Sequence, residues 1–347
     1  MTSTPWTTDL PADTRPDTSP RPDATLLVSA VRAGLITARE VAERAVELRG
    51  SVLVLHGQPI AYARSHGVSG ARDAADRERR VLRLLADTGL VPELCGRDDV
   101  IWTAAVRGER LGAVSGTMAE LAEICQRWGA AIATLHLTRI AAASEPPVAP
   151  RPWVLDPDRL PRTMRQAPAG SARAFVLRTV RGDRGLQRTV GRVAERWSAD
   201  HWTHGDLTED RIRVQHAPEL RVRFVDLRSG GLGDPGWDLA GALETVSELT
   251  AGPRAPWGTA NAACLTDFLL LGYRRAGGSA SVEAGTRALR IVARAWEQAA
   301  LLDARTAHPA SMHPAAGRPD EATLLTERLG LARELAARCA RTGLAAA

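Results

Sequence analysis

Lysine is absent from this chain of 347 residues, because all 45 of its Lys and Arg residues are arginine. Asparagine is almost absent as well and occurs only at Asn261. A role that needs an ammonium group must be filled by a guanidinium or be lost, and the two cations are not equivalent. The formal net charge of +5 is modest, and no aromatic-rich basic motif accompanies it, so we expect no nucleic-acid partner.

Long apolar runs and paired cysteines are also missing. No run of 18 or more apolar residues occurs, so we expect no membrane span. The N-terminus lacks a basic region followed by an apolar stretch, so we expect no secretory signal. The cysteines form neither a metal-type pair nor a disulfide framework, which fits a reducing cytoplasm. They are Cys95, Cys125, Cys264 and Cys339.

The first third of the chain predicts a tail followed by a β-rich lobe. Residues 1–24 are rich in Thr, Pro and Asp without periodicity, which predicts a disordered tail. Residues 25–112 form the predicted N-lobe. A capping-box pattern opens a helix from Thr37 to about Glu47. Two strands within "SVLVLHGQPIAYAR", a helix over "ARDAADRERRVLRLLAD" and a strand in "DVIWTAAV" follow.

Residues 113–347 form the predicted C-lobe, which is mostly helical. A second capping box opens a helix from Thr117 to about Thr138, and an irregular connection follows over 144–172. Further helices are expected in "FVLRTVRGDRGLQRTVGRVAERW" and over about 237–249, 258–276, 283–303 and 321–341. A small β-rich lobe before a large helical lobe predicts an α+β fold of the two-lobed, protein-kinase-like kind.

The stretch "HGDLTEDRIRV", residues 204–214, contains the candidate catalytic residues. Phosphoryl transfer needs an aspartate beside the acceptor hydroxyl, metal ligands and positive charge on the phosphates. Asp206 precedes a strand and can supply the aspartate beside the acceptor hydroxyl. His204 would hold the loop in place by hydrogen bonds. Asp226 ends the next strand and can supply a metal carboxylate. The hairpin between the two would bring these side chains together.

The segment 224–240 contains a second motif. Residues 231–236, "GLGDPG", formally match the G-x-G-x-x-G dinucleotide fingerprint. We reject that interpretation, because Asp234 would place a negative charge at a pyrophosphate and no βαβ unit surrounds the match. A helix start is the better account, with Asp234 as N-cap and Pro235 at the first helical position. Asp238 could then bond back to the 204–214 loop.

"HGDL", the strand-end Asp226 and "GDPGWDLA" together resemble the aminoglycoside phosphotransferase/choline kinase family. The resemblance covers about residues 26–303 and implies ATP and Mg²⁺ as cofactors. It aligns Arg64, in "PIAYARSHG", with the family's nucleotide-binding lysine and Glu78 with that lysine's glutamate partner. "IWTAAVRGERL" resembles the family's hinge segment, and "GAAIATLHL" resembles its helix ending in Leu-His.

Three departures from this family pattern leave catalysis open. The lysine is replaced, and only "RGS" at 49–51 offers a phosphate loop. Arg211 stands where the family carries a metal-binding asparagine, and a guanidinium has no acceptor for Mg²⁺. Its charge could contact a phosphate or a carboxylate instead. Asp210, or Glu209 beside it, could take over as metal ligand.

"GLITAREV", "PPVAPRPWVL" and "HWTHGDL…GDPGWDLAGAL" further resemble the kinase-like subunits of class V lanthipeptide and thioamitide pathways. This resemblance implies phosphorylation of Ser/Thr in a precursor peptide, with a separate lyase as partner. Residues 251–347 carry more Arg than Asp plus Glu, which makes a polycationic aminoglycoside a poor acceptor. A peptide kinase, a pseudokinase that only binds its partner and a small-molecule kinase all stay open.

Overall fold

The computed structural model describes residues 22–43, 45–49, 52–64, 71–95, 100–140, 145–157, 167–216, 218–251, 255–258, 260–307 and 321–344. Its contacts divide the chain into two compact units. The smaller comprises Met1–Ala75 and Pro92–Val106, and the larger comprises Asp76–Val91 and Arg107–Ala347. The predicted boundaries at residues 24/25 and 112/113 stay predictions. This division assigns residues 76–91, which lie inside the predicted N-lobe, to the larger unit.

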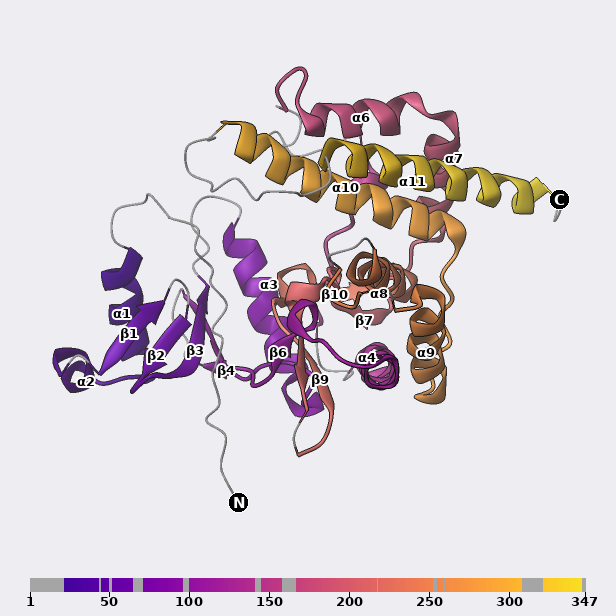
Figure 1. The fold of residues 1–347 in the computed structure, drawn as a ribbon. Coiled ribbons are helices and arrows are strands. Elements are labelled where there is room, and N and C mark those ends of the chain that lie inside the picture. The colour runs from indigo at the N-terminus through magenta and orange to yellow at the C-terminus, as the bar shows by residue number, and fades with distance from the viewer. Residues whose placement is uncertain are drawn as a thin grey trace. The chain divides into compact units, whose positions relative to one another are not determined.

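The smaller unit is a five-stranded antiparallel sheet with two short helices, and its strand order is β1-β2-β3-β5-β4 (Figure 1). Buried Leu53, Ala61 and Trp102 pack in its core, and the Trp102 indole donates to Ser29 Oγ at 3.0 Å. The elements are α1 (Pro22–Arg32), α2 (Ala38–Ala42), β1 (Val46–Arg49), β2 (Val52–Leu55), β3 (Gln58–Arg64), β4 (Leu94–Cys95) and β5 (Ile101–Ala104).

The strand-turn-strand prediction for residues 51–64 is confirmed by the β2–β3 hairpin. His56 and Gly57 both have positive φ, 49° and 77°, as a type I′ turn requires. The Thr37 capping box is present, but the predicted helix end near Glu47 is wrong, because α2 stops at Ala42 and β1 pairs with β2. Helix α1 includes residues 22–24 of the predicted tail, whose residues 1–21 lie outside the described part.

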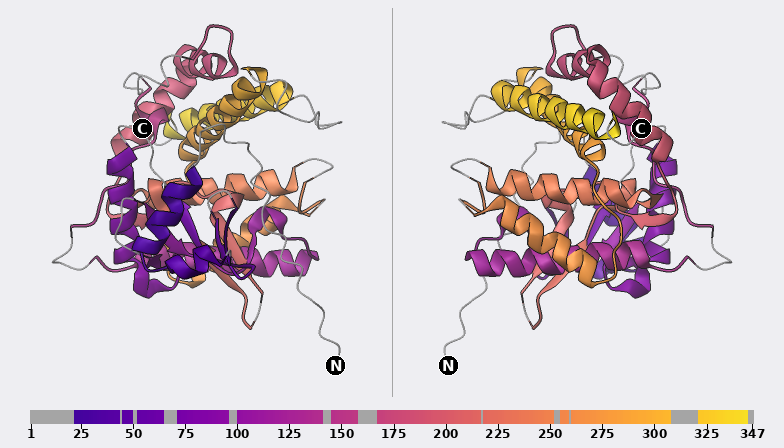
Figure 2. Two further views of the ribbon diagram at one scale, coloured as in Figure 1. Left: turned by 90° about the vertical axis from the view of Figure 1, so that its left-hand side faces the viewer. Right: turned by 90° about the vertical axis from the view of Figure 1, so that its right-hand side faces the viewer.

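The larger unit is mostly helical. In Figures 1 and 2 the long helices α10 and α11 lie side by side, and α6 and α7 pack against them. Helices α4 and α9 form another close pair, and α8 contacts both α9 and α10. The helices are α3 (Ala71–Leu84, shared with the smaller unit), α4 (Met118–Leu137), α6 (Ala172–Gly182), α7 (Arg184–Arg196), α8 (Pro235–Thr250), α9 (Ala262–Arg275), α10 (Ala284–Ala307) and α11 (Glu321–Leu344).

Several sequence predictions for this unit are confirmed, and one is corrected. Both bonds of the Thr117 capping box are present at the start of α4. The helix expected between Phe175 and Trp197 is instead two helices. Asp183 separates them, since its carboxylate accepts from the backbone N–H groups of Gly185 and Leu186 and so opens a new helix.

Short strands carry the loops of interest. The predicted hairpin is confirmed as β8 (Ile212–Gln215) with β9 (Arg221–Phe224), and β6 (Glu109–Arg110) extends it on the other side of β8. A separate pair joins β7 (His201–Thr203) to β10 (Gly231–Gly233). Within the described residues, no helix combines the length and apolar character needed to cross a membrane.

Candidate functional site

The 204–214 loop leaves β7 through a turn that only glycine fits well. Gly205 has φ +78°, and a Cβ at this position would lie 2.3 Å from the Ser229 carbonyl oxygen. Both the left-handed backbone and the close approach therefore exclude a larger residue. Because Thr203 in β7 pairs with Gly231 in β10, the loop runs beside the segment that follows Asp226.

Helix α8 holds this loop from its first three turns. The carboxylate of Asp234 accepts from the Gly236 N–H at 2.8 Å and caps the helix, with Pro235 in the first turn. Asp238 accepts from the N–H groups of His204, at 2.7 Å, and Gly205, at 2.8 Å. The hydrogen bonds between the loop N–H groups and Asp238, expected from the sequence, are therefore present.

A buried chain of hydrogen bonds continues behind Asp238. His136 at the end of α4 approaches the Asp238 carboxylate at 3.4 Å, and its other ring nitrogen lies 3.0 Å from the Tyr273 hydroxyl. Burial alone would raise the pKa of Asp238, but its hydrogen bond and charge interaction with His136 lower it overall. This carboxylate is therefore ionised and fully partnered. We call the residues that hold the loop backbone, directly or through Asp238, the loop support: His136, His204, Trp237, Asp238, Thr245 and Tyr273.

Other members of the loop support fix the loop's carbonyl groups. The Trp237 indole donates to the Gly205 carbonyl at 3.3 Å, and the Thr245 hydroxyl donates to the Leu207 carbonyl at 2.9 Å. Helix α8 thus bonds both donors and acceptors of the loop backbone, which leaves this backbone little freedom.

His204 links the loop to the end of β9. Its Nε2 lies 3.0 Å from the Val225 carbonyl, and its Nδ1 accepts from the Asp206 N–H at 3.2 Å. These two bonds require a neutral ring with the proton on Nε2. Complete burial lowers the pKa of His204 and stabilises that neutral form. His204 is thus a positioning residue that orients Asp206.

Two arginines hold the carboxylate of Asp206. Arg290 on α10 donates to Oδ1 at 3.0 Å, and the Nε of Arg211 lies 3.7 Å from Oδ2. Burial would raise the pKa of Asp206, but the charges of Arg290 and Arg211 outweigh it and lower the pKa to about 2. Asp206 is therefore ionised at neutral pH, and one fifth of its side chain is exposed.

Asp226 is also held by two arginines. Arg211 Nη1 pairs with Oδ2, and Arg228 Nε lies 3.3 Å from Oδ1. Its backbone is left-handed, with φ 64° and ψ 65°, a conformation that asparagine and aspartate tolerate better than most residues and that occurs often at functional sites. One guanidinium, that of Arg211, therefore pairs with both Asp206 and Asp226. We call the group Asp206, Arg211, Asp226, Arg228 and Arg290 the arginine cluster.

Sequence reasoning missed Arg290. It is only 5% exposed, and its guanidinium carbon lies 5.4 Å from the Trp237 ring centroid, within cation–π range. Gly241 makes room for it, since a Cβ there would lie 3.1 Å from Arg290 Nε. No local pattern in α10 distinguishes this arginine from its neighbours, because its partner lies 84 residues earlier in the chain.

The predicted metal ligands do not assemble into a Mg²⁺ site in this arrangement. Asp210 pairs with Arg110 at 3.0 Å and is largely exposed, and Glu209 pairs with Arg294 at 3.2 Å. No three His, Cys, Asp or Glu side chains come together as a metal-binding group among the described residues. Mg²⁺ requires free oxygen ligands, whereas both carboxylates of the cluster already pair with guanidinium groups. The residues present therefore do not fit the metal.

The predicted nucleotide contacts can be followed only in part. Glu78 in α3 is 1% exposed, and one of its carboxylate oxygens accepts from the Leu227 N–H at 3.1 Å. Arg64 ends β3, but its side chain lies outside the described part of the structure, as do Gly50 and Ser51 of the candidate phosphate loop. The pairing of Arg64 with Glu78 and their nucleotide role stay predictions.

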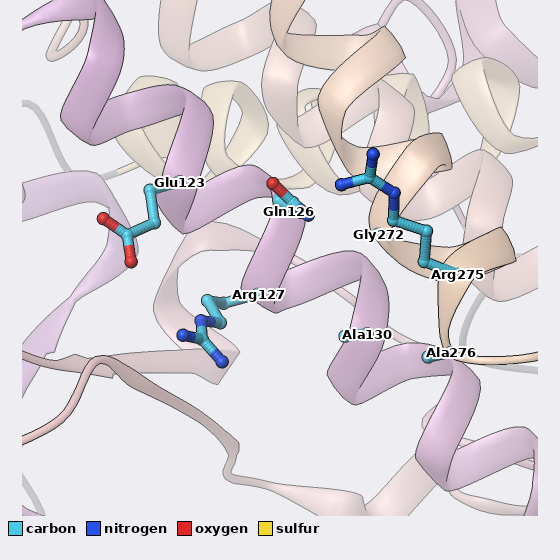
Figure 3. A pocket seen from close by; sticks show the side chains of 7 residues that line it. All are labelled: Glu123, Gln126, Arg127, Ala130, Gly272, Arg275 and Ala276. Atoms are coloured by element: carbon cyan, nitrogen blue, oxygen red, sulfur yellow. The ribbon is translucent and has the colours of Figure 1, made fainter.

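A hollow of about 530 Å³ lies along the crossing of α4 and α9 (Figure 3). Glu123, Gln126 and Arg127 of α4 and Arg275 of α9 line it, with small residues between them. It contains no residue of the loop support or of the arginine cluster, and we assign it no part in the site.

Comparisons with known proteins agree with this fold. The choline kinase LicA of Streptococcus pneumoniae aligns with 91% of this chain and 99% of its own, at 15% identity and TM-score 0.56. Plasmodium vivax ethanolamine kinase aligns over 89% and 88%, at 11% identity and TM-score 0.57. The aminoglycoside phosphotransferase APH(3'')-Id of Streptomyces rimosus, in complex with ADP and streptomycin, aligns over 78% and 97%, at 19% identity and TM-score 0.52.

These identities are low enough that the likeness shows the fold alone, which is the kinase-like α+β fold expected from the sequence. No curated protein sequence matches the chain. A family model described as the phosphotransferase enzyme family matches residues 61–279, a span that includes the loop support and most of the arginine cluster. Because that span is more than half of the sequence, the chain belongs to the phosphotransferase enzyme family.

Proposed function

We propose that this protein transfers the terminal phosphoryl group of ATP to serine or threonine hydroxyls of a precursor peptide. The observation that carries the proposal is the anchored Asp206. Its backbone N–H bonds to His204, the backbone of the two preceding residues bonds to Asp238, and its carboxylate stays ionised. A solvated loop with no function would not need a buried ionised Asp238 beneath it, since burying charge costs free energy.

In this proposal Asp206 accepts a hydrogen bond from the acceptor hydroxyl and orients its oxygen toward the terminal phosphorus. The new O–P bond forms as the bond to the bridging oxygen of ATP breaks, ADP leaves, and the hydroxyl proton passes to Asp206. A carboxylate with a pKa near 2 is a weak base. Phosphoryl transfer nevertheless has a loose transition state, in which positioning and charge contribute more than base strength.

The sequence resemblance to lanthipeptide and thioamitide kinase-like subunits favours a peptide acceptor, as does the arginine excess of the last hundred residues. A separate lyase that eliminates the phosphate would then be a partner. Choline, ethanolamine and aminoglycosides, the acceptors named for the structural neighbours, are cations and define the small-molecule alternative.

A second candidate function is a pseudokinase subunit that binds the peptide or the lyase without transferring phosphate. One specific observation favours it, namely the guanidinium of Arg211 between Asp206 and Asp226. In this arrangement both carboxylates are already paired, so a metal–nucleotide complex would have to displace Arg211 from at least one of them.

The test uses ATP labelled on its terminal phosphate, with peptides encoded by neighbouring genes, choline and streptomycin as separate acceptors. We expect label on a peptide and its loss in Asp206→Asn, while the matched variant Asp210→Asn keeps it. Label on choline or streptomycin alone would show that the acceptor is a small molecule and not a peptide. No transfer to any acceptor, with peptide binding unchanged in Asp206→Asn, would establish the binding subunit instead.

A further inference from the structure

The arginine cluster contains more positive than negative charge. Three guanidinium groups, from Arg211, Arg228 and Arg290, contact two carboxylates, and this leaves one positive charge in excess. Asp210 and Glu297 also act on the charge of Arg211, but each has a cation of its own, since Asp210 pairs with Arg110 and Glu297 with Arg294. A divalent cation is poorly matched to such a site, whereas an anion is well matched.

The three arginines are not equally accessible. Arg290 is almost fully buried. Arg211 has 22% of its side chain exposed and Arg228 has 52%, so both can present N–H groups to a ligand while still paired with Asp226. A guanidinium has five N–H donors, of which a carboxylate uses two at most. The remaining donors of Arg211 and Arg228 define the face on which a ligand would bind.

We propose that Arg211 and Arg228 form a phosphate site that works without a divalent metal. The guanidinium of Arg211 takes the central position between Asp206 and Asp226, contacts both carboxylates, and turns its remaining N–H donors to a phosphate group. Phosphate oxygens suit this geometry, because planar guanidinium groups bind them through paired, charge-assisted hydrogen bonds. Arg290 holds Asp206 from the other side and keeps its charge compensated.

The ligand chemistry is a phosphate ester, and this inference rests on the proposed function, in which phosphate is the transferred group. Two sources share that chemistry, namely the terminal phosphate of ATP and the phosphorylated serine or threonine of a product. The cluster contacts only the phosphate in either case, so binding probes must separate them.

The test measures equilibrium binding of ATP, phosphoserine and inorganic phosphate by calorimetry, each with excess EDTA and with excess Mg²⁺. We expect the full chain to bind at least one phosphate ester in EDTA, with an affinity within about threefold of that in Mg²⁺. Binding of ATP alone would identify the nucleotide as the source, and binding of phosphoserine alone would identify the product. Binding that appears only with Mg²⁺, or no binding of any probe, would overturn the inference.

Two variants make the test specific. Arg211→Gln removes the central cation and is expected to weaken binding in EDTA at least tenfold, or about 1.4 kcal/mol. Arg221→Gln removes an exposed arginine of the same hairpin, which pairs with Glu219 at 3.4 Å, and is expected to bind as the parent does. Equal losses of affinity in the two variants would show that binding depends on overall positive charge, and would contradict a specific site at Arg211.

The inference and the proposed function can fail separately. Metal-independent binding without transfer to any acceptor would leave the phosphate site intact and remove the kinase activity. Transfer that depends on Mg²⁺, together with binding that also depends on it, would leave the kinase and remove the metal-free site.

Discussion

The loop support and the arginine cluster lie on two sides of the same short loop and differ in how they are built. The loop support has one ionised carboxylate, Asp238, surrounded by hydrogen-bond donors and closed by the neutral His204. The arginine cluster has two carboxylates neutralised by three cations. One side keeps the loop backbone in place, and the other sets the charge that a ligand meets.

This difference suggests which parts of the site can change. The backbone of residues 203–207 is hydrogen-bonded to β10 and to side chains of α8, and His136 of α4 contacts Asp238 behind it. A substitution in the loop support therefore disturbs several groups at once. Arg211 contacts its partners only through its side-chain tip, so the residue at this position can differ while the loop keeps its course. The protein therefore combines a tightly held loop backbone with a positively charged side chain, Arg211, between the two aspartates.

The largest effect is expected from Asp238→Ala. It leaves the N–H groups of His204 and Gly205 buried without an acceptor and should lower the free energy of unfolding by about 4 kcal/mol. Urea unfolding followed by tryptophan fluorescence measures the change. Asp267→Ala, on the exposed face of α9, serves as the control and should stay within about 0.5 kcal/mol of the parent. Similar losses of unfolding free energy in both variants would show that the loop support does not contribute more to stability than an exposed residue does.

The next effect is expected from Arg290→Met. The change keeps much of the side-chain volume against Trp237 but removes the cation 3.0 Å from Asp206. Asp206 then retains Arg211 and some solvent, so we expect a loss of about 3 kcal/mol. A double-mutant cycle with Asp206→Asn isolates the pair. A coupling near zero would mean that Arg290 stabilises α10 by packing alone.

Local signals account for the parts of this fold that the sequence predicted. The Thr37 and Thr117 capping boxes, the turn at His56 and Gly57, and the Asp234 cap each act within four residues. Such signals can be recognised in the sequence without knowledge of the tertiary structure. The end of α2 was misjudged because the pairing of β1 with β2 is decided by a neighbouring strand and overrides helical periodicity.

The charged part of the site shows where sequence reasoning stops. Asp206, Asp226 and Arg211 were all identified from their motifs, but two partners for Arg211, a phosphate or a carboxylate, stayed open. The contact with both aspartates is a property of the folded β8–β9 hairpin. Arg290 could not be found, because an arginine on an amphipathic helix is ordinarily solvated. Its ion pair with Asp206 and its packing against Trp237 and Gly241 arise only in the folded structure.

A pH effect is expected from the arginine cluster. The pKa of Asp206 is lowered from 3.8 to about 2, so its ionised form stabilises the fold above about pH 4. This contribution, about 2 kcal/mol, is lost as the pH falls from about 4 to about 2. The difference in unfolding free energy between the parent and Asp206→Asn should shrink over that window. A difference that stays constant would show that the arginines do not lower this pKa.

The smallest effect is expected from Asp210→Asn, which separates the arginine cluster from the exposed charges beside it. Asp210 pairs with Arg110 at 3.0 Å, but 60% of its side chain is exposed. Exposed ion pairs contribute little, so the free energy of unfolding should change by less than about 0.5 kcal/mol. Phosphate binding in EDTA and peptide labelling should also stay at the parent level, since Asp210 is already engaged outside the cluster. Loss of labelling with unchanged stability would instead make Asp210 a metal ligand that Arg110 releases when the substrate binds. That outcome would support a metal-dependent kinase and would contradict a phosphate site in which Arg211 takes the place of the metal.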